Sequence, residues 1–375
     1  MSDRLSHKPS LTLFSPAPRQ VVSTPGLALL PNPIEMGLGG GGGSGDAAGA
    51  LRGFAREAGG CAVVDGGLAT ELEAHGADLQ DALWSAKCLA TAPNLIRKVH
   101  LDYLEASANI ITSASYQATI QGFQSRGLSR DESEALLRRS VHVAHEARRV
   151  FVDGQPRPPV VLVAASIGSY GAYLADGSEY SGDYGKSVTK DALKSFHRRR
   201  LQVLAGAGPD LIAFETIPNK LEAQAYAELL EENGIWIPAW FSFTSKDGVN
   251  AASGDPIAEC AAVAESCERV AAVGVNCTAP RLIHRLILSI KKVTSKPIVV
   301  CPNSGETYIA ETKEWVDTTG ASGTDFASCV SEWRKAGASL IGGCCRTSPA
   351  TVRAIARALR EADDDYDDVP AVAVL

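Results

Sequence analysis

The sequence of 375 residues lacks any apolar stretch that approaches the about 18–20 residues of a membrane helix. We therefore expect no membrane-spanning segment. An excess of basic residues is also missing, because 36 Lys and Arg stand against 43 Asp and Glu, a formal net charge of −7. A protein that binds nucleic acid normally presents a basic face, so we expect no nucleic-acid partner.

A regular framework of paired cysteines, as found in small secreted domains, is absent too. The nine cysteines are an odd number spread along a long chain, which indicates a reducing compartment and favours a cytoplasmic protein. Six of them stand singly in apolar or helical contexts. We interpret these six as small hydrophobic core residues: Cys61, Cys88, Cys260, Cys267, Cys301 and Cys329.

The two ends of the chain differ in composition from its middle. Residues 1–33 are rich in Ser and Pro and poor in acids, and 38–45 are almost all glycine, which is typical of a flexible linker. We expect a disordered or targeting extension at 1–50, a folded domain at 51–362 and an acidic tail at 363–375. If residues 1–35 are a transit peptide, we expect the protein in the plastid instead of the cytoplasm. In an alternative interpretation Met36 is the start codon, and residues 1–35 do not belong to the native protein.

Eight short apolar runs alternate with helical patterns through the folded region. Such alternation predicts parallel β-α units, and runs that are apolar throughout suit strands covered on both faces. We therefore predict a (β/α)8 TIM barrel, with an open doubly wound sheet as the rival. The expected strands are 61–64, 109–112, 160–164, 210–214, 237–241, 270–275, 297–300 and 339–342.

Start signals for the intervening helices are visible in the sequence. Ser129 and Glu132 fit a capping box. Asp255-Pro256 and Ser348-Pro349 each place a cap residue before a proline at the first helical position.

A polar or metal-binding side chain follows every expected strand. In a closed barrel these positions share one rim, where barrel enzymes build their sites, so the pattern favours the barrel over the open sheet. The residues are Asp65, Thr112, Ser166, Glu215, Ser242, Asn276 with Cys277, Asn303, and Cys344 with Cys345.

The three strand-end cysteines suggest one soft metal ion, Zn²⁺. Cys344 and Cys345 would point to opposite faces of a regular strand, but Gly342-Gly343 before them lets the backbone turn. Cys277 lies 67 residues upstream, so only the tertiary fold can bring it to the pair. No fourth Cys or His stands at a strand end, which favours a catalytic zinc with an open position.

Two other interpretations of these cysteines remain open. In the first, the zinc is purely structural and joins the sixth and eighth strands. In the second, Cys344 and Cys345 form a redox pair whose oxidation to a vicinal disulfide would eject the metal.

A zinc ion with three thiolates is suited to holding a substrate thiol as a nucleophilic thiolate. A free thiol has a pKa near about 8.5 and is only slightly ionised at neutral pH, and metal binding removes that limit. The reaction to expect is alkylation of a thiol. Asp65 and Glu215 supply carboxylates for a substrate ammonium group, which indicates an amino-acid substrate.

At this point several motifs together resemble the zinc-dependent homocysteine S-methyltransferases, the plant enzymes above all, from about Gly59 to Leu359. The motifs are Asp65-Gly-Gly-Leu-Ala-Thr-Glu-Leu-Glu, Thr112-Ser-Ala-Ser-Tyr-Gln-Ala-Thr, Ala165-Ser-Ile-Gly-Ser-Tyr-Gly-Ala-Tyr-Leu-Ala-Asp-Gly-Ser-Glu-Tyr, Phe214-Glu-Thr-Ile-Pro, Gly274-Val-Asn-Cys, Pro302-Asn-Ser-Gly-Glu and Gly342-Gly-Cys-Cys-Arg-Thr.

The resemblance implies a set of site residues. Cys277, Cys344 and Cys345 match the zinc ligands, and Asp65 and Glu215 match carboxylates that hold the amino group of homocysteine. We expect two further residues to bind substrate. Tyr116 is similar in position to a pocket tyrosine of a betaine-using relative, and Asn276 shares its strand end with Cys277.

The resemblance also implies the reactants. S-methylmethionine is the expected methyl donor, S-adenosylmethionine is used less well, and betaine is the main competing donor.

Four tyrosines near the rim have two open interpretations, stabilisation of a sulfonium by cation–π contact or packing within a loop. They are Tyr170, Tyr173, Tyr180 and Tyr184. The segment 168–184 is predicted to act as a lid, and the oligomeric state is left open.

Overall fold

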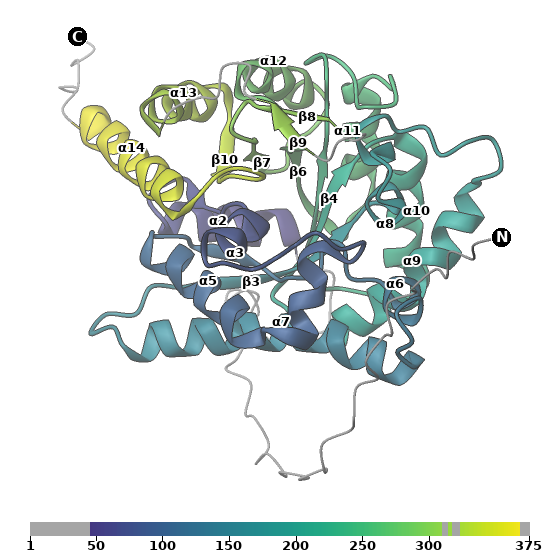
Figure 1. Cartoon of the computed structure of the whole chain (residues 1–375). Coiled ribbons are helices and arrows are strands. Elements are labelled where there is room, and N and C mark those ends of the chain that lie inside the picture. Colours follow the sequence, from purple (N-terminus) through teal and green to yellow (C-terminus); the bar gives the residue numbers. More distant parts are fainter. Residues whose placement is uncertain (1–45, 310–313, 317–322, 368–375) are drawn as a thin grey trace, which may run out of the picture.

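A computed structural model describes residues 46–309, 314–316 and 323–367, and its centre is one sheet of eight parallel strands (Figure 1). The strands follow the order β1-β10-β7-β6-β5-β4-β3-β2. Their bounds are β1 Ala62–Val63, β2 Ile110–Thr112, β3 Leu162–Gly168, β4 Leu211–Ile217, β5 Ala239–Phe243, β6 Val270–Asn276, β7 Ile298–Cys301 and β10 Ala338–Ile341. Each overlaps one of the eight strands expected from the sequence.

The sheet closes on itself between its first two strands. A parallel bridge joins Val64 to Ile110, Asp65 N donates to Ile110 O at 3.0 Å, and Asn109 N donates to Val63 O at 2.7 Å. Because β1 also pairs with β10, no open edge remains between the ends of the strand order. The predicted (β/α)8 barrel is confirmed, and the open doubly wound sheet is excluded.

Helices surround the barrel on its outer face (Figure 1). They are α3 Leu68–Ala74, α4 Cys88–Thr91, α5 Pro93–Glu105, α6 Ile120–Gln124, α7 Arg130–Asp153, α8 Tyr170–Leu174, α9 Lys190–Ala205, α10 Lys220–Glu232, α11 Ile257–Ser266, α12 Pro280–Lys291, α13 Gly323–Ala336 and α14 Pro349–Asp367, with short 3-10 turns η1 Trp84–Lys87 and η2 Ser178–Tyr180. The outer core between helices and sheet is formed by buried aliphatic and aromatic side chains of both layers.

The barrel interior is a second, separate core, and the N-terminal helix α2 (Ala47–Glu57) completes it. Leu51 and Phe54 of α2 cluster with inward-facing strand residues such as Leu162 and Trp240. Burying these side chains removes one open end of the barrel from water, which stabilises the fold. The folded domain therefore begins at the helix cap Asp46, inside the predicted 1–50 extension; the rest of that extension, residues 1–45, lies outside the described residues.

The helix starts agree with the sequence patterns in two of three cases. Ser129 and Glu132 form the predicted capping box of α7, and α14 begins at Pro349 as expected. At α11 the assignment shifts by one residue, because Pro256 is itself the N-cap, with an extended ψ of 129°. The Asp255 carboxylate instead accepts hydrogen bonds from Lys220 N and Ser253 Oγ.

Two further features depart from the expected plan. A two-stranded antiparallel sheet, β8 (Thr307–Ile309) with β9 (Glu314–Val316), is inserted between β7 and α13. Helix α14 runs to Asp367, five residues into the predicted acidic tail.

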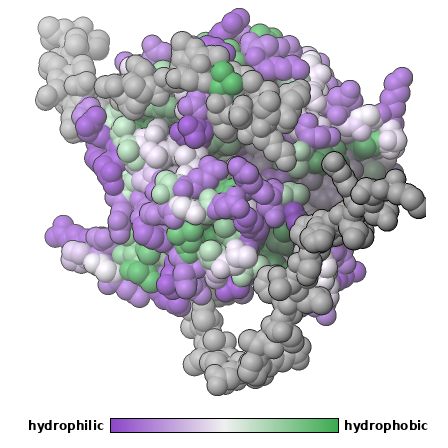
Figure 2. Space-filling view, in the orientation of Figure 1, coloured by the Kyte–Doolittle hydropathy of each residue, from purple (hydrophilic) through white to green (hydrophobic). Residues whose placement is uncertain are grey.

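None of the helices in the described ranges is long and apolar enough to cross a bilayer. The face seen in Figure 2 is mainly hydrophilic with small scattered hydrophobic patches.

Candidate functional site

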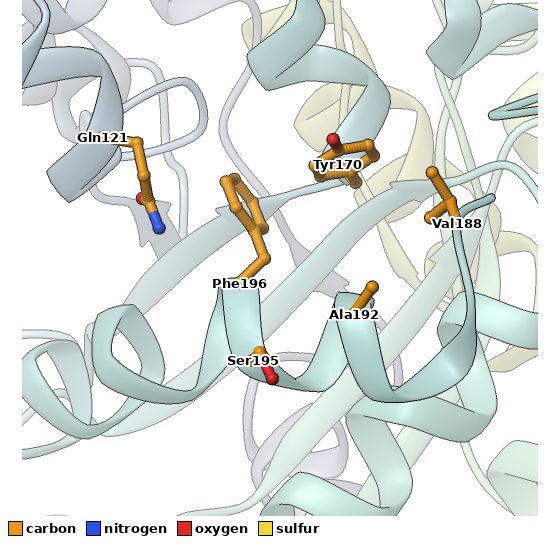
Figure 3. Close-up of a pocket in the computed structure, with 6 residues that line it drawn as sticks. All are labelled: Gln121, Tyr170, Val188, Ala192, Ser195 and Phe196. Atoms are coloured by element: carbon orange, nitrogen blue, oxygen red, sulfur yellow. The ribbon is translucent and has the colours of Figure 1, made fainter.

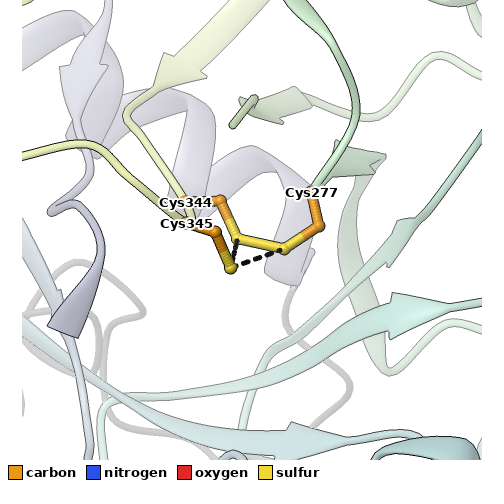
Figure 4. Close-up of side chains that lie close together, drawn as sticks. All are labelled: Cys277, Cys344 and Cys345. Atoms are coloured by element: carbon orange, nitrogen blue, oxygen red, sulfur yellow. Dashed lines mark hydrogen bonds between the residues drawn. A yellow bond between two sulfur atoms is a disulfide. The ribbon is translucent and has the colours of Figure 1, made fainter. Parts of the chain in front are cut away.

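Three cysteine sulfur atoms lie together where β6 and β10 end (Figure 4). Cys277 and Cys344 are joined as a disulfide with a Cα–Cα separation of 5.5 Å. Cys345 Sγ lies 3.7 Å from Cys277 Sγ and 4.0 Å from Cys344 Sγ. The redox alternative expected a bond between the adjacent cysteines 344 and 345, whereas the structure pairs residues 67 positions apart.

The spacing of these sulfurs fits one tetrahedral metal ion. Each of the three residues offers one sulfur, and all three atoms lie within 4.8 Å of one another. Thiolates bound to Zn²⁺ at about 2.3 Å are about 3.8 Å apart in a tetrahedron, close to the two non-bonded separations seen here. A disulfide sulfur is not a thiolate, so the Cys277–Cys344 bond must be reduced before the set can bind metal.

Two glycines bring the cysteine pair into place by close packing. A Cβ on Gly342 would approach Val64 O to 2.5 Å, and one on Gly343 would collide with Thr347 Oγ1. Neither glycine has a positive φ; the chain turns at Arg346, whose φ is 63°. Gly342 is therefore needed for the close approach to Val64 after β1, and Gly343 for the close approach to Thr347. The predicted turn uses a positive φ at neither glycine.

The Cys345 thiol is held in its protonated form when no cation is near. Burial and the neighbouring Glu215 raise its pKa to about 12, and a hydrogen bond with the side chain of Tyr180 opposes this shift. Such a thiol ionises when a metal replaces its proton. Without a metal ion, Cys345 is therefore a poor nucleophile.

Asp65 lies at the end of β1 and is 2% exposed. Its Oδ2 accepts a hydrogen bond of 2.7 Å from Thr112 N, and Thr112 Oγ1 lies 3.1 Å from both carboxylate oxygens. Burial raises the pKa of Asp65 well above its usual range, and repulsion from Glu215 adds to the shift. No cationic side chain of the described residues forms an ion pair with it.

Glu215 lies on β4 and interacts with Asp65 across the barrel interior. Its Oε1 accepts a hydrogen bond from Ser166 Oγ on β3. Burial raises the pKa of Glu215 to about 7, against a smaller opposite effect of Ser166 and of Arg200. The guanidinium of Arg200 donates to main-chain oxygens of Gly168 and Ser115 rather than to the carboxylate. Asp65 and Glu215 are therefore two interacting carboxylates with raised pKa values, the first buried and the second partly buried.

A bulge in β4 presents Glu215 to the interior. The register with β5 shifts between Phe214 and Ile217, and Thr216 has a φ of 55°, which is rare for a β-branched residue. The Asn276 amide stabilises this conformation, because its Oδ1 accepts from Thr216 N at 2.7 Å and its Nδ2 donates to Thr216 Oγ1 at 2.9 Å. The structure thus places Asn276 of β6 in support of β4, two strands away in the sheet, with its Nδ2 3.9 Å from Cys344 Sγ.

Tyr116 follows β2 and lies at the same mouth of the barrel. Its hydroxyl is hydrogen-bonded to the side chain of Thr216, and the charges around it are those of Glu179, Cys345 and Glu215. Its ring packs edge-on against Trp84 at 6.5 Å. The structure therefore brings Tyr116 together with the carboxylates and the sulfurs, as predicted.

The four rim tyrosines divide into two groups. Tyr170 packs against Phe196 at 4.9 Å and against Tyr184 at 5.3 Å, and Tyr173 packs against Phe196 at 5.0 Å. These three form a packed cluster, while Tyr180 reaches Cys345. The loop-packing interpretation therefore describes three of them, and only Tyr180 is placed at the site.

A buried carboxylate anchors the segment 168–184, the predicted lid. Glu222 on α10 accepts hydrogen bonds from Tyr170 N and from the Tyr184 hydroxyl, both at 2.6 Å. His197 Nε2 lies 2.8 Å from the same carboxylate. Movement of this segment as a lid stays a prediction.

Glu179, within this segment, is a polar residue of the site that was not singled out from the sequence. It lies on η2, beside Tyr180, and its charge acts on Tyr116 and Cys345. The available signal was its place in the motif Asp176-Gly-Ser-Glu-Tyr. Sequence alone did not show that this loop returns to the barrel mouth.

Two other features of the surface are separate from this site. A cavity of about 310 Å³ contains neither the cysteines nor the two carboxylates in its lining, and Tyr170 is its only rim tyrosine (Figure 3). It is lined by Gln121, Tyr170, Val188, Ala192, Ser195 and Phe196. Glu71, His75 and Asp102 also cluster, but Lys98 Nζ lies 3.2 Å from His75 Nε2 and 3.3 Å from Asp102 Oδ2. The ammonium group of Lys98 thus already forms an ion pair with Asp102 in that cluster.

Comparison with known proteins gives consistent matches. A family model described as homocysteine S-methyltransferase matches residues 62–359. Homocysteine S-methyltransferase 4 of Zea mays is 83% identical over 342 residues, covering 89% of this chain and 99% of that protein. A selenocysteine Se-methyltransferase of Brassica oleracea var. italica is 64% identical over 314 residues, covering 81% and 90%.

A solved structure agrees with this result. The homocysteine methyltransferase MmuM from Escherichia coli, in its metallated form, is similar with a TM-score of 0.71 at 43% identity, covering 80% of this chain and 96% of that one. The matched range spans the barrel from β1 to the middle of α14, and with it all three cysteines and both carboxylates. The chain is an S-methyltransferase and belongs to the homocysteine S-methyltransferase family.

Proposed function

We propose that this chain transfers a methyl group from S-methylmethionine to homocysteine and forms methionine. The observation that carries the proposal is the convergence of three cysteine sulfurs with the carboxylates of Asp65 and Glu215, neither of which forms an ion pair among the described residues, although Arg200 acts on Glu215 from a distance. A thiol and an ammonium group are the two functional groups that homocysteine offers to such a site.

Cys277, Cys344 and Cys345 are the proposed ligands of one Zn²⁺ ion. When bound, zinc supplies a Lewis acid at which a substrate thiol loses its proton at neutral pH. The metallated form of the Escherichia coli relative supports a metal at this place. A three-cysteine set leaves a ligand position for the substrate, which supports a catalytic rather than a purely structural ion.

Asp65 and Glu215 are proposed to bind the ammonium group of homocysteine. Thr112 and Ser166 orient the two carboxylates through hydrogen bonds, so little reorganisation is needed when substrate enters. A bound ammonium ion offsets the repulsion between the carboxylates and lowers the pKa of both. Asn276 contributes by holding the bulge that presents Glu215.

Methyl transfer to the homocysteine sulfur balances without a further reactant. The bond between the methyl carbon and the donor sulfonium breaks, and its electron pair stays on the donor sulfur. A new bond forms from the homocysteine sulfur to the same carbon, and the thiol proton has left to solvent at binding. With S-methylmethionine as donor, both products are methionine.

Steady-state kinetics with reduced, zinc-loaded protein test the proposal, with S-methylmethionine, S-adenosylmethionine and betaine compared as donors. We expect the highest kcat/KM with S-methylmethionine, a lower value with S-adenosylmethionine and no turnover with betaine. Preference for betaine would contradict the proposed donor. Absence of methionine with every donor would contradict the proposed activity.

Selenocysteine is a second candidate acceptor, favoured by the 64% identity to a selenocysteine Se-methyltransferase. A selenol resembles a thiol in its affinity for soft metals, and selenocysteine carries the same ammonium group. The same kinetic experiment with selenocysteine in place of homocysteine decides between the acceptors. The acceptor with the higher kcat/KM is the one to which the site is adapted.

A further inference from the structure

The segment that follows β3 places an acidic side chain, Glu179, close to the sulfur cluster. A Cβ on Gly171 would collide with the backbone nitrogen of Glu179, so α8 and η2 are packed without space between them. The next residue, Tyr180, is hydrogen-bonded to Cys345. The position of Glu179 is therefore set by packing on one side and by the cysteine cluster on the other.

Glu179 buries an oxygen atom for which no partner exists among the described residues. Its Oε2 is shielded from solvent and forms no hydrogen bond, and the same is true of Oγ of the adjacent Ser178. Burial raises the pKa of Glu179 to about 7, and repulsion from Asp176 adds to the shift. A shielded carboxylate oxygen without a hydrogen bond is costly for the free protein, so a ligand group that donates to Glu179 Oε2 would stabilise the site.

The carboxylates of the site come from different parts of the chain, Asp65 and Glu215 from the ends of β1 and β4 and Glu179 from the segment after β3. Asp65 and Glu215 interact with each other, whereas the pKa of Glu179 responds to Asp176 but to neither of them. Glu179 and Glu215 both act on Tyr116 and Cys345, so both carboxylates face the surroundings of the cysteine cluster. The proposed reaction joins two amino acids, each with an ammonium group, and the Asp65–Glu215 pair accounts for only one of them.

We propose that Glu179 binds the α-ammonium group of the sulfonium methyl donor, with the Ser178 hydroxyl beside it. This inference rests on the proposed function, because it assigns the second substrate of that reaction. It adds a donor subsite formed by the segment after β3 to the homocysteine subsite formed by β1 and β4.

The charge change during methyl transfer explains why the ammonium, and not the sulfonium, is the expected partner. The sulfonium loses its positive charge as the methyl group leaves, so a carboxylate beside it would stabilise the ground state more than the transition state and slow the reaction. The ammonium keeps its charge throughout. A carboxylate that binds it lowers the KM of the donor and leaves kcat nearly unchanged.

The test compares Glu179→Gln with Asp183→Asn, an exposed acid in the same segment whose hydrogen bond to Gly185 N survives the change. Calorimetric titration of zinc-loaded, homocysteine-free protein with S-methylmethionine gives the donor Kd, and steady-state kinetics give both KM values. For E179Q we expect the donor Kd and KM to rise by about 30-fold or more. The homocysteine KM, the zinc content and kcat at saturating donor should match those of wild type and of D183N.

A second experiment uses a methyl donor without an amino group, a dimethylsulfonium carboxylate, with wild type and with E179Q. It lacks the ammonium group, so wild type and E179Q should use it equally. An equal loss with both donors, or a loss confined to homocysteine, would overturn the inference. If E179Q does not fold, Glu179→Asp keeps the charge but withdraws it by one methylene, and unchanged donor binding in that variant would also overturn it.

Failure of this inference is distinguishable from failure of the proposed function. If wild type forms no methionine with any sulfonium donor, the function is wrong, and the calorimetric comparison still reports on Glu179. If wild type forms methionine and E179Q binds the donor normally, only the assignment of Glu179 is wrong.

Discussion

Replacing Cys345 by alanine should abolish methionine formation from homocysteine and S-methylmethionine. Two cysteines remain, too few to hold zinc with a position for substrate, and the homocysteine thiol then stays mostly protonated at neutral pH. We expect zinc content to fall from about one per chain to near zero, and kcat/KM to fall by at least about 1000-fold, because a metal of this kind contributes several kcal/mol to catalysis. Metal analysis and kinetics on reduced protein measure both quantities.

Cys260→Ala is the matched control for this prediction. Cys260 is a fully buried thiol of α11, outside the cluster formed by residues 277, 344 and 345. The control should keep zinc and activity while losing some stability from the small cavity. Full zinc content and turnover in C345A would show that this cysteine is not a ligand.

Glu215→Gln should have two effects of opposite sign, a loss of homocysteine binding and a gain in stability of the ligand-free protein. Removing one carboxylate from the ammonium subsite costs about 3 kcal/mol of binding, so the homocysteine KM should rise by about 100-fold. The donor KM should not change, which is the reverse of the pattern expected for E179Q. Kinetics with each substrate varied in turn separate the two subsites.

The stability effect follows from the raised pKa of Glu215. Burial moves it from 4.5 to about 7, so the folded state holds this proton more tightly than the unfolded state. Stability is therefore lost as pH rises from about 4.5 to 7, by on the order of 2 kcal/mol. E215Q removes this cost and should melt several degrees above wild type at pH 8, with the difference vanishing below about pH 4.5.

Thermal melts of substrate-free E215Q across this pH range, with D183N as the control, test the effect. Asp183 is exposed, so its replacement should leave the melting curve nearly unchanged at every pH. A melting temperature of E215Q below that of wild type at pH 8 would contradict the account. It would mean that the carboxylate stabilises the fold.

The barrel and the cysteine cluster were predictable because their signals are local or follow from topology. Eight apolar runs marked the strands, and Ser129 with Glu132 marked the start of α7, as the structure confirms. Closure of the sheet then places the ends of β6 and β10 one strand apart, on either side of β7. For this reason Cys277 and Cys345 could be expected together although 68 positions separate them.

Three features were missed for physical reasons. Helix α2 follows a glycine run directly, and its role in closing the barrel depends on contacts of Leu51 with distant strands. The bulge at Thr216 runs against local preference, since a β-branched residue rarely adopts positive φ; the Asn276 side chain makes it possible. Glu179 enters the site only because the segment after β3 returns to the barrel mouth.

X-ray absorption at the zinc edge of reduced, zinc-loaded protein, with and without homocysteine, tests the central claim most directly. Without substrate we expect three sulfur ligands and one lighter ligand at the zinc, and with homocysteine four sulfur ligands near about 2.3 Å. An unchanged spectrum on addition of homocysteine, or four protein ligands in its absence, would contradict the account. Either result would indicate a zinc ion that only joins the strand ends of β6 and β10.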